Sequence, residues 1–328
     1  MERIGLNDLD TERDRFDAIV GRAGHLDRFC SSTAWILPAQ AALMAPREPW
    51  IFRGEQGYVA MMRARHPAGF TYAESLEAAW GLACPLVGAD GTEWMPKVGE
   101  LFHRRQAEWD VLLVTGLIDA SRVGEAFVEQ FGTDHRIQRG ETTPRYVASL
   151  ADGLDGFLSR RSSNLRRSLS RASRRAASVG IELTWWDGST PADADVALSR
   201  IRQIELGSWK GRQRLGLAEA PLWPFYRQMS HRLLAAGRLR ILFARHEDRD
   251  VGYYLGGVFA TTFRGLQCSY DAEYRRVGLG NLLQLEQVRR HAEEGYEQYD
   301  LGTGAGHYKK RWSDQLVTST AILVIRSR

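Results

Sequence analysis

The sequence has few cysteines and no long hydrophobic run, and these two shortages exclude several classes of protein. Its 328 residues include only three cysteines, Cys30, Cys84 and Cys268, and no C-x-x-C pair. Such spacing fits a reducing compartment and argues against zinc, so we expect no bound metal. The longest apolar stretches, 111–114 and 321–325, are far too short to span a bilayer. The first residues are charged and do not resemble a secretory signal, which predicts a cytoplasmic protein.

Lysine is also scarce, because 40 of the 44 basic residues are arginine. The content of 44% hydrophobic and 26% charged residues is that of a globular protein with an ample core, which excludes disorder, collagen and coiled coil. The charge is unevenly distributed along the chain. Residues 1–150 contain 16 basic and 21 acidic residues, whereas residues 151–328 contain 28 and 19. This asymmetry predicts that the second half binds an anionic partner.

Helical and extended patterns alternate along the chain, which predicts a mixed α/β fold. The length and the shift in charge predict two domains, residues 1–150 and residues 151–328. The second domain is expected to contain three consecutive strands, then a helix and a further short strand, at residues 239–245, 252–262, 265–270, 280–294 and 297–301.

The most informative segment lies between the third of these strands and the helix. There the sequence Arg275-Arg276-Val277-Gly278-Leu279-Gly280 places two arginines and two glycines at a strand-to-helix turn. Glycines permit a tight turn, and the N–H groups and dipole of a helix start attract an anion. The arginines add positive charge suited to a pyrophosphate. The segment is not a Rossmann fingerprint, since Leu283 stands where a third glycine is needed, nor does it contain the Gly-Lys-Ser/Thr of a Walker loop.

This Arg-x-x-Gly-x-Gly pattern resembles the pyrophosphate loop of the GNAT acyltransferases. Wider stretches are similar to the cellulose-biosynthesis (CelD/BcsL-like) branch of that superfamily. The likeness covers about residues 155–315 and is carried by Ser208-Trp209-Lys210-Gly211, by residues 270–283, and by residues 299–304 with 308–312. More faintly, residues 31–35 (Ser-Ser-Thr-Ala-Trp) resemble the N-terminal segment of the same branch.

That branch is similar in architecture to the Fem-type aminoacyl transferases. The resemblance therefore implies tandem GNAT-like halves, each a mixed, mainly antiparallel sheet flanked by helices. Residues 1–150 would be a degenerate copy that shapes the substrate cleft, and residues 151–328 would bind acyl-CoA. The implied donor is acetyl-CoA or a longer acyl-CoA, with no metal. The residues implied to bind it are Arg275, Arg276, Val277, Gly278, Leu279, Gly280 and Asn281.

Acyl transfer by direct attack needs a base for the nucleophile and benefits from an acid for the leaving thiolate. Asp271 and Asp300 each end a strand at the same edge of the sheet, so each is a candidate base; alternatively, each only caps the adjoining loop. Tyr308 follows the second of these strands, where GNAT enzymes often carry an acidic tyrosine, and a structural tyrosine would fit equally well. The sequence contains neither a G-x-S-x-G elbow nor a cysteine arranged with a histidine, so we expect no covalent intermediate.

Four further residues form the predicted substrate-binding set. Trp209 would form one wall of the acceptor or acyl pocket, and Lys210 would bind an anionic group. The alternative is that neither residue binds a ligand and Lys210 is a solvent-exposed lysine packed on Trp209. Tyr270 and Lys309 lie in the other family-like segments and complete the set. The acceptor is expected to be an amine or hydroxyl of a small molecule, glycan or peptide, in envelope polysaccharide or secondary-metabolite synthesis.

Residues 160–175 contain seven arginines and no acidic residue. On a helix, most of them share one face, which would bind the phosphates of CoA, an anionic glycan, tRNA or an anionic lipid surface, or would simply be solvated. Two other functions therefore stay open. One is Fem-like transfer from an aminoacyl-tRNA, and the other is a non-catalytic accessory role in polysaccharide synthesis.

Overall fold

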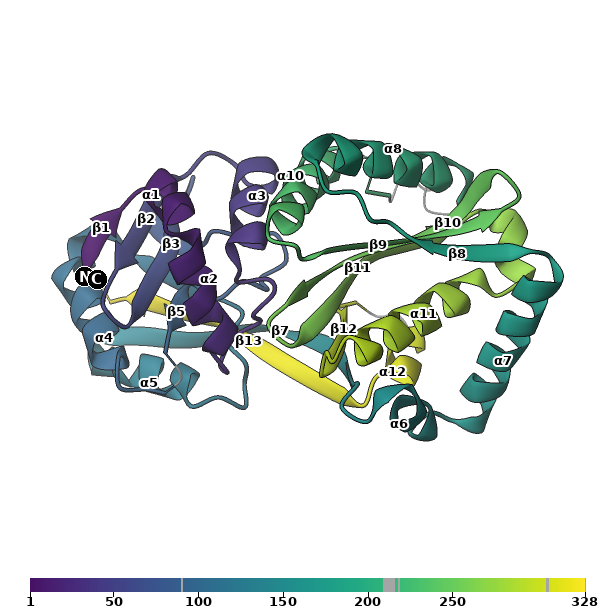
Figure 1. Cartoon of the computed structure of the whole chain (residues 1–328). Coiled ribbons are helices and arrows are strands. Elements are labelled where there is room, and N and C mark those ends of the chain that lie inside the picture. Colours follow the sequence, from purple (N-terminus) through teal and green to yellow (C-terminus); the bar gives the residue numbers. More distant parts are fainter. Residues whose placement is uncertain (90, 209–215, 218, 305–306, 328) are drawn as a thin grey trace. The chain divides into compact units, whose positions relative to one another are not determined.

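Figure 1 shows the computed structural model of the chain, which describes residues 1–328 except 90, 209–215, 218, 305, 306 and 328. The chain divides into two compact units, one formed by Met1–Pro144 with Val317–Arg328 and the other by Arg145–Leu316. The domain boundary expected at residue 150 stays a prediction. Most of the last strand, from Val317 on, groups with the first unit.

The first unit combines a sheet with helices. Its strands follow the order β1-β2-β3-β4-β6-β13-β7, with β5 paired to β3. β4 and β6 run parallel, whereas β1 with β2, β2 with β3, and β6 with β13 are antiparallel. The elements are β1 (Glu2–Ile4), α1 (Leu6–Thr11), α2 (Arg13–Arg22), α3 (Thr33–Leu43), β2 (Glu48–Arg53), β3 (Gly57–Arg65), β4 (Thr71–Ser75), β5 (Leu86–Gly88), α4 (Met95–Arg104), β6 (Val111–Val114), α5 (Val123–Glu129), β7 (His135–Ser149) and β13 (Gln315–Arg326).

The second unit begins with the end of β7 and has the strand order β7-β12-β11-β10-β9-β8. β11 and β12 run parallel, and the other neighbours are antiparallel. The elements are α6 (Gly153–Ser159), α7 (Ser163–Ser178), β8 (Ile181–Trp185), α8 (Pro191–Gly207), α10 (Leu222–Ala235), β9 (Leu239–His246), β10 (Arg249–Phe259), β11 (Thr262–Tyr270), a 3-10 turn (Ala272–Arg276), α11 (Leu279–Glu293), β12 (Gln298–Gly302) and α12 (His307–Trp312). The predicted mixed α/β fold with mainly antiparallel sheets and flanking helices is confirmed.

Helices cover both faces of the sheet in the second unit. α8 and α10 pack on one face, and α11 packs on the other together with α6 and α7 (Figure 1). Consecutive residues of β10 show the alternation, because Tyr253 bonds to α8 and Tyr254 lies on the α11 side, where its partner Tyr299 bonds to Gln284. Successive side chains of β10 therefore point to opposite faces of the sheet, one toward α8 and the other toward α11.

Most of the arginine-rich segment lies in α7, as its pattern predicts, whereas Arg160 and Arg161 precede this helix. Ser162 caps this helix by accepting a hydrogen bond from the backbone N–H of Leu165 at 3.3 Å. Its apolar stripe, which includes Leu165, Leu169 and Ala176, is buried in the core of the second unit. Burial of this stripe turns the arginines toward solvent.

Candidate functional site

The strands β11 and β12 separate partway along the sheet. They are paired only where residues 262–264 lie beside residues 298–300, although β11 continues to Tyr270. β11 also contains a bulge, since Leu255 pairs with Gln267 and Gly256 pairs with Gly265. Leu266 is therefore the extra residue on β11, and the ladder is disrupted where the two strands part.

A pocket of about 1030 Å³ lies at this opening. Its walls are residues 265–270 of β11, the loop before α11, the end of β12, and α12. Three cations, Arg275, Lys309 and Arg311, contribute to the lining, and the described lining residues include no aspartate or glutamate. A concave surface with charge of one sign attracts the opposite charge, so this pocket suits an anionic ligand.

The loop before α11 owes its shape to two glycines. Gly278 caps α11 with φ +88°, a left-handed conformation that favours glycine, and a Cβ there would lie 3.0 Å from the Cβ of Ala172 in α7. A Cβ on Gly280 would lie 2.9 Å from the ring of Tyr270. Both glycines line the pocket with Asn281, so the positive end of a fifteen-residue helix meets the cavity. This arrangement is a suitable anion site.

The pocket brings together most of the residues predicted to bind donor or substrate. The predicted residues that line it are Tyr270, Arg275, Gly278, Gly280, Asn281, Tyr308 and Lys309. Three others do not: Leu279 and Val277 pack in the core, and Arg276 contributes its backbone carbonyl, which accepts a hydrogen bond from Arg175 at 2.9 Å. Trp209 and Lys210 lie outside the described residues.

Asp271 does not line the pocket. Its carboxylate caps the 3-10 turn by accepting a hydrogen bond from the backbone N–H of Glu273 at 3.1 Å, and it pairs with Arg249 at 3.1 Å. These contacts favour the alternative of a loop cap over that of a catalytic base.

Asp300 is buried and also does not line the pocket. It accepts hydrogen bonds from Arg145 at 3.0 Å, from Arg264 at 2.5 Å and from the backbone N–H of Gly302 at 2.7 Å. Two cations and an amide thus occupy its oxygens. The geometry favours a role in fixing the point where β11 and β12 part.

Tyr308 does line the pocket and is 48% exposed. The protein atoms around the cavity desolvate its phenol and, with the nearby thiol of Cys268, raise the pKa of Tyr308 to about 12. The phenol is therefore protonated at neutral pH and can donate a proton to a leaving group.

Several pocket residues were not singled out from the sequence. Cys268 and Tyr254 line the cavity from neighbouring positions on β11 and β10, and the hydroxyl of Tyr254 lies 2.5 Å from that of Tyr299. Burial raises the pKa of both tyrosines well above 10, so both stay protonated. Side chains alternate along a strand, so the sequence could have predicted that Tyr254 and Cys268 share a face of the sheet. That prediction would have required the pairing register of β10 and β11, which was unknown.

The arginines of α7 lie beside the same loop. The hydroxyl of Ser168 lies 3.4 Å from the side-chain amide of Asn281. Arg160 pairs with Asp152 at 2.7 Å, and Arg161 pairs with Asp314. Those two arginines precede α7, and the five within it have no carboxylate partner in the described part of the chain; they are Arg166, Arg167, Arg171, Arg174 and Arg175.

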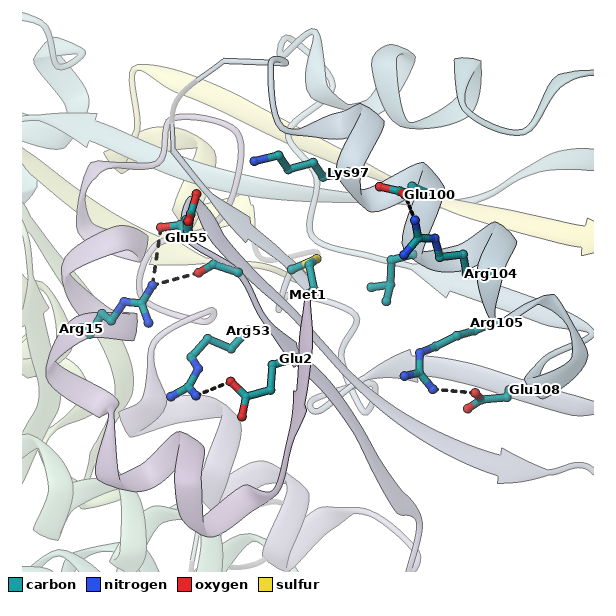
Figure 2. A pocket seen from close by; sticks show the side chains of 12 residues that line it. Met1, Glu2, Arg15, Arg53, Glu55, Lys97, Glu100, Arg104, Arg105 and Glu108 are labelled. Atoms are coloured by element: carbon teal, nitrogen blue, oxygen red, sulfur yellow. Dashed lines mark hydrogen bonds and ion pairs between the residues drawn. The ribbon is translucent and has the colours of Figure 1, made fainter.

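A second pocket, of about 890 Å³, lies in the first unit (Figure 2). Its lining is charged, but the charges largely neutralise one another. Figure 2 shows the ion pairs Arg53 with Glu2, Arg104 with Glu100, and Arg105 with Glu108. Exposed pairs of this kind are common on protein surfaces. Five basic and four acidic side chains line the pocket, so little net charge remains to select a ligand.

Within the described residues, no group of three or more histidine, cysteine, aspartate or glutamate side chains is arranged to hold a metal ion. The helices described here include none that is long and apolar enough to cross a membrane.

Comparison with known proteins places the pocket in a recognised kind of domain. Residues 163–310 match the family model of the acetyltransferase (GNAT) domain, a segment that includes the whole loop before α11. The resemblance to the GNAT superfamily is thus confirmed for this segment, while the cellulose-biosynthesis branch stays a prediction. No match was found among curated proteins.

Solved structures share the fold over most of the chain. FemX has a TM-score of 0.68 and 10% identity, covering 98% of this chain and 97% of its own. A conserved protein of unknown function from Bacteroides thetaiotaomicron VPI-5482 has a TM-score of 0.66 and 12% identity, covering 99% of both. The C-terminal domain of a putative lysylphosphatidylglycerol synthetase from Agrobacterium fabrum has a TM-score of 0.53 and 14% identity, covering 88% and 90%. At these identities the similarity establishes the fold alone.

Proposed function

We propose, from the match of residues 163–310 to the GNAT acetyltransferase domain, that this chain transfers an acyl group from acyl-CoA to an acceptor. The observation that supports this most directly is the pocket where β11 and β12 part, with cations but no carboxylates among its described lining residues. The donor's pyrophosphate would bind at Arg275 and the start of α11, where Gly278 and Gly280 keep the approach free of side chains.

The proposed reaction is direct attack of the acceptor on the thioester carbonyl. The bulge at Leu266 releases backbone from the ladder beside the cavity, so an N–H group of β11 would polarise the carbonyl oxygen. Tyr308 would protonate the leaving thiolate. Asp271 and Asp300, which were candidate bases, have no place in this step because other groups already occupy their oxygens.

The finer assignments rest on the sequence likeness. We propose an N- or O-acyltransferase of the cellulose-biosynthesis branch, acting on a small molecule, glycan or peptide in envelope polysaccharide or secondary-metabolite synthesis. Residues 1–150 would be a degenerate GNAT-like half, and a cytoplasmic location stays a prediction.

Donor binding is tested by thermal unfolding with and without acetyl-CoA and palmitoyl-CoA. At a ligand concentration of roughly 100 Kd, binding to the native state alone adds about 2.7 kcal/mol to its stability. The Arg275→Ala variant should lose this shift, because its guanidinium lines the pocket. Arg276→Ala is the matched control and should keep it, since Arg276 contacts Arg175 through its backbone. An unchanged midpoint with both ligands in the wild type would contradict acyl-CoA as the donor.

The arginines of α7 favour a second candidate, transfer from an aminoacyl-tRNA. Five arginines that have no carboxylate partner among the described residues lie beside the proposed phosphate-binding loop, and they suit a donor whose phosphates extend beyond the pocket. Binding of aminoacyl-tRNA that weakens steeply with salt, together with no response to CoA, would support it. An accessory protein without catalysis would be recognised by a CoA-dependent shift in midpoint with no release of thiol.

A further inference from the structure

The donor pocket contains a group of uncharged polar side chains that the proposed mechanism does not use. Gln284 lies one turn of α11 beyond Gly280, and Tyr254 reaches the cavity from β10. Both side chains are buried, with 8% and 6% exposure. Tyr299 is fully buried and joins the other two through its hydroxyl. Buried polar groups beside a cavity commonly orient a ligand.

The hydroxyl of Tyr254 lies at the point where β11 and β12 part. A Cβ built on Gly265 would lie 2.3 Å from this hydroxyl, so the phenol packs directly on the backbone of β11. Gly265 follows Arg264, the last residue of β11 that is paired with β12, and precedes the bulge residue Leu266. By standard bond lengths, the hydroxyl is at most about 6 Å from the backbone nitrogen of Leu266. An acyl group whose carbonyl oxygen is bound there would therefore reach Tyr254 within its first few carbon atoms.

The hydrogen bonds within this group have a fixed direction. Burial keeps both phenols protonated, because it raises the pKa of Tyr254 and of Tyr299 well above 10. Tyr299 donates its one proton to Oε1 of Gln284 at 3.3 Å. Tyr254 is then the donor in the 2.5 Å hydrogen bond between the two phenols. The group therefore offers the cavity one acceptor, the oxygen of Tyr254, and one donor, the side-chain nitrogen of Gln284.

These two atoms call for a ligand group of one particular chemistry. Within the described residues, no other group forms a hydrogen bond with the oxygen of Tyr254 or with the side-chain nitrogen of Gln284. A hydroxyl satisfies both atoms at once, since it donates to one and accepts from the other. A carboxylate only accepts and an ammonium only donates, so each would satisfy one atom alone. A plain alkyl chain would leave both without a partner, which weakens its binding.

We infer that the acyl group of the donor bears a hydroxyl close to its carbonyl, which donates to Tyr254 and accepts from Gln284. This inference rests on the proposed acyl transfer and names its donor class, a hydroxyacyl-CoA. Leu266 and Leu301 also line the pocket, and they provide apolar contacts for the carbon atoms of such a group.

The test measures binding by calorimetry, so that no acceptor is needed. The ligands are butyryl-CoA and its 2-hydroxy and 3-hydroxy derivatives, with CoA as the reference. We expect the wild type to bind at least one hydroxy derivative about tenfold more tightly than butyryl-CoA, the effect of one to two hydrogen bonds. Tyr254→Phe should reduce this ratio to near one and leave the affinity for CoA unchanged. Tyr296→Phe is the matched control and should keep the ratio, because its hydroxyl accepts from Arg240 at 3.4 Å and does not line the pocket.

A second variant keeps the test decisive if Tyr254→Phe folds poorly. Gln284→Met has a side chain of similar length without the donor, and it should likewise abolish the preference for the hydroxy derivative. Equal affinities of the wild type for all three acyl ligands, or a preference that both variants retain, would overturn the inference. An equal loss for every ligand in Tyr254→Phe, CoA included, would also overturn it, since the group would then bind a part common to all of them. Failure of the wild type to bind any of these ligands, including CoA, would instead contradict the proposed donor.

Discussion

Substitution of Asp300 by asparagine separates a structural carboxylate from a catalytic one. Asp300 is 2% exposed and neutralises Arg264, which is also buried, while Arg145 supplies a second hydrogen bond. Asparagine keeps an oxygen for the N–H of Gly302 but leaves a buried guanidinium without its counter-ion. Removing one partner of a buried ion pair costs about 3–5 kcal/mol. For a unit of this size we expect the midpoint to fall by roughly 6 to 20 °C.

The assay is thermal unfolding of the full chain, with hydrogen exchange of peptides from Arg145–Leu316 to locate the change. The double variant Asp300→Asn/Arg264→Gln should be less destabilised than the sum of the single variants, because it removes both members of the pair. Asp271→Asn is the control, since its partner Arg249 is largely exposed and an exposed pair contributes less than about 1 kcal/mol. If Asp300→Asn unfolded at the wild-type midpoint yet lost acyl transfer a hundredfold, Asp300 would be a base and the reasoning would be wrong.

Three other predictions concern the loop, the acid and a buried histidine. Gly278→Ala should lose about 1–2 kcal/mol of stability from its left-handed φ alone, and should weaken the acetyl-CoA-dependent shift in midpoint. Tyr308→Phe should lower turnover about a hundredfold and leave the acetyl-CoA-dependent shift in midpoint unchanged. If turnover and this shift were lost to the same extent, Tyr308 would not be the acid. Burial lowers the pKa of His291 from 6.5 to about 4, so the unfolded state takes up a proton first as pH falls. The second unit should therefore lose about 3 kcal/mol between pH 6.5 and pH 4, and urea unfolding of His291→Gln should show a smaller pH dependence.

The loop before α11 could be located from sequence because its chemistry is local. The conformation of Gly278 and the anion site at the helix start depend on residues within one turn. The motif Arg-x-x-Gly-x-Gly is therefore enough to predict where the loop and its anion site lie. The same is true of α7, where the apolar stripe alone fixes which side of the helix is buried. The elements of the second unit were accordingly expected near their observed positions.

The roles of the acidic residues depend on contacts between distant segments, which a single sequence does not reveal. Asp300 ends its strand as expected, but its partners Arg145 and Arg264 come from two neighbouring strands whose register was unknown. Glu205 of α8 was not singled out from the sequence, because its contact with the hydroxyl of Tyr253 on β10 exists only in the folded unit. Strand ends are therefore good predictors of where polar residues gather, and poor predictors of which carboxylate is free to react.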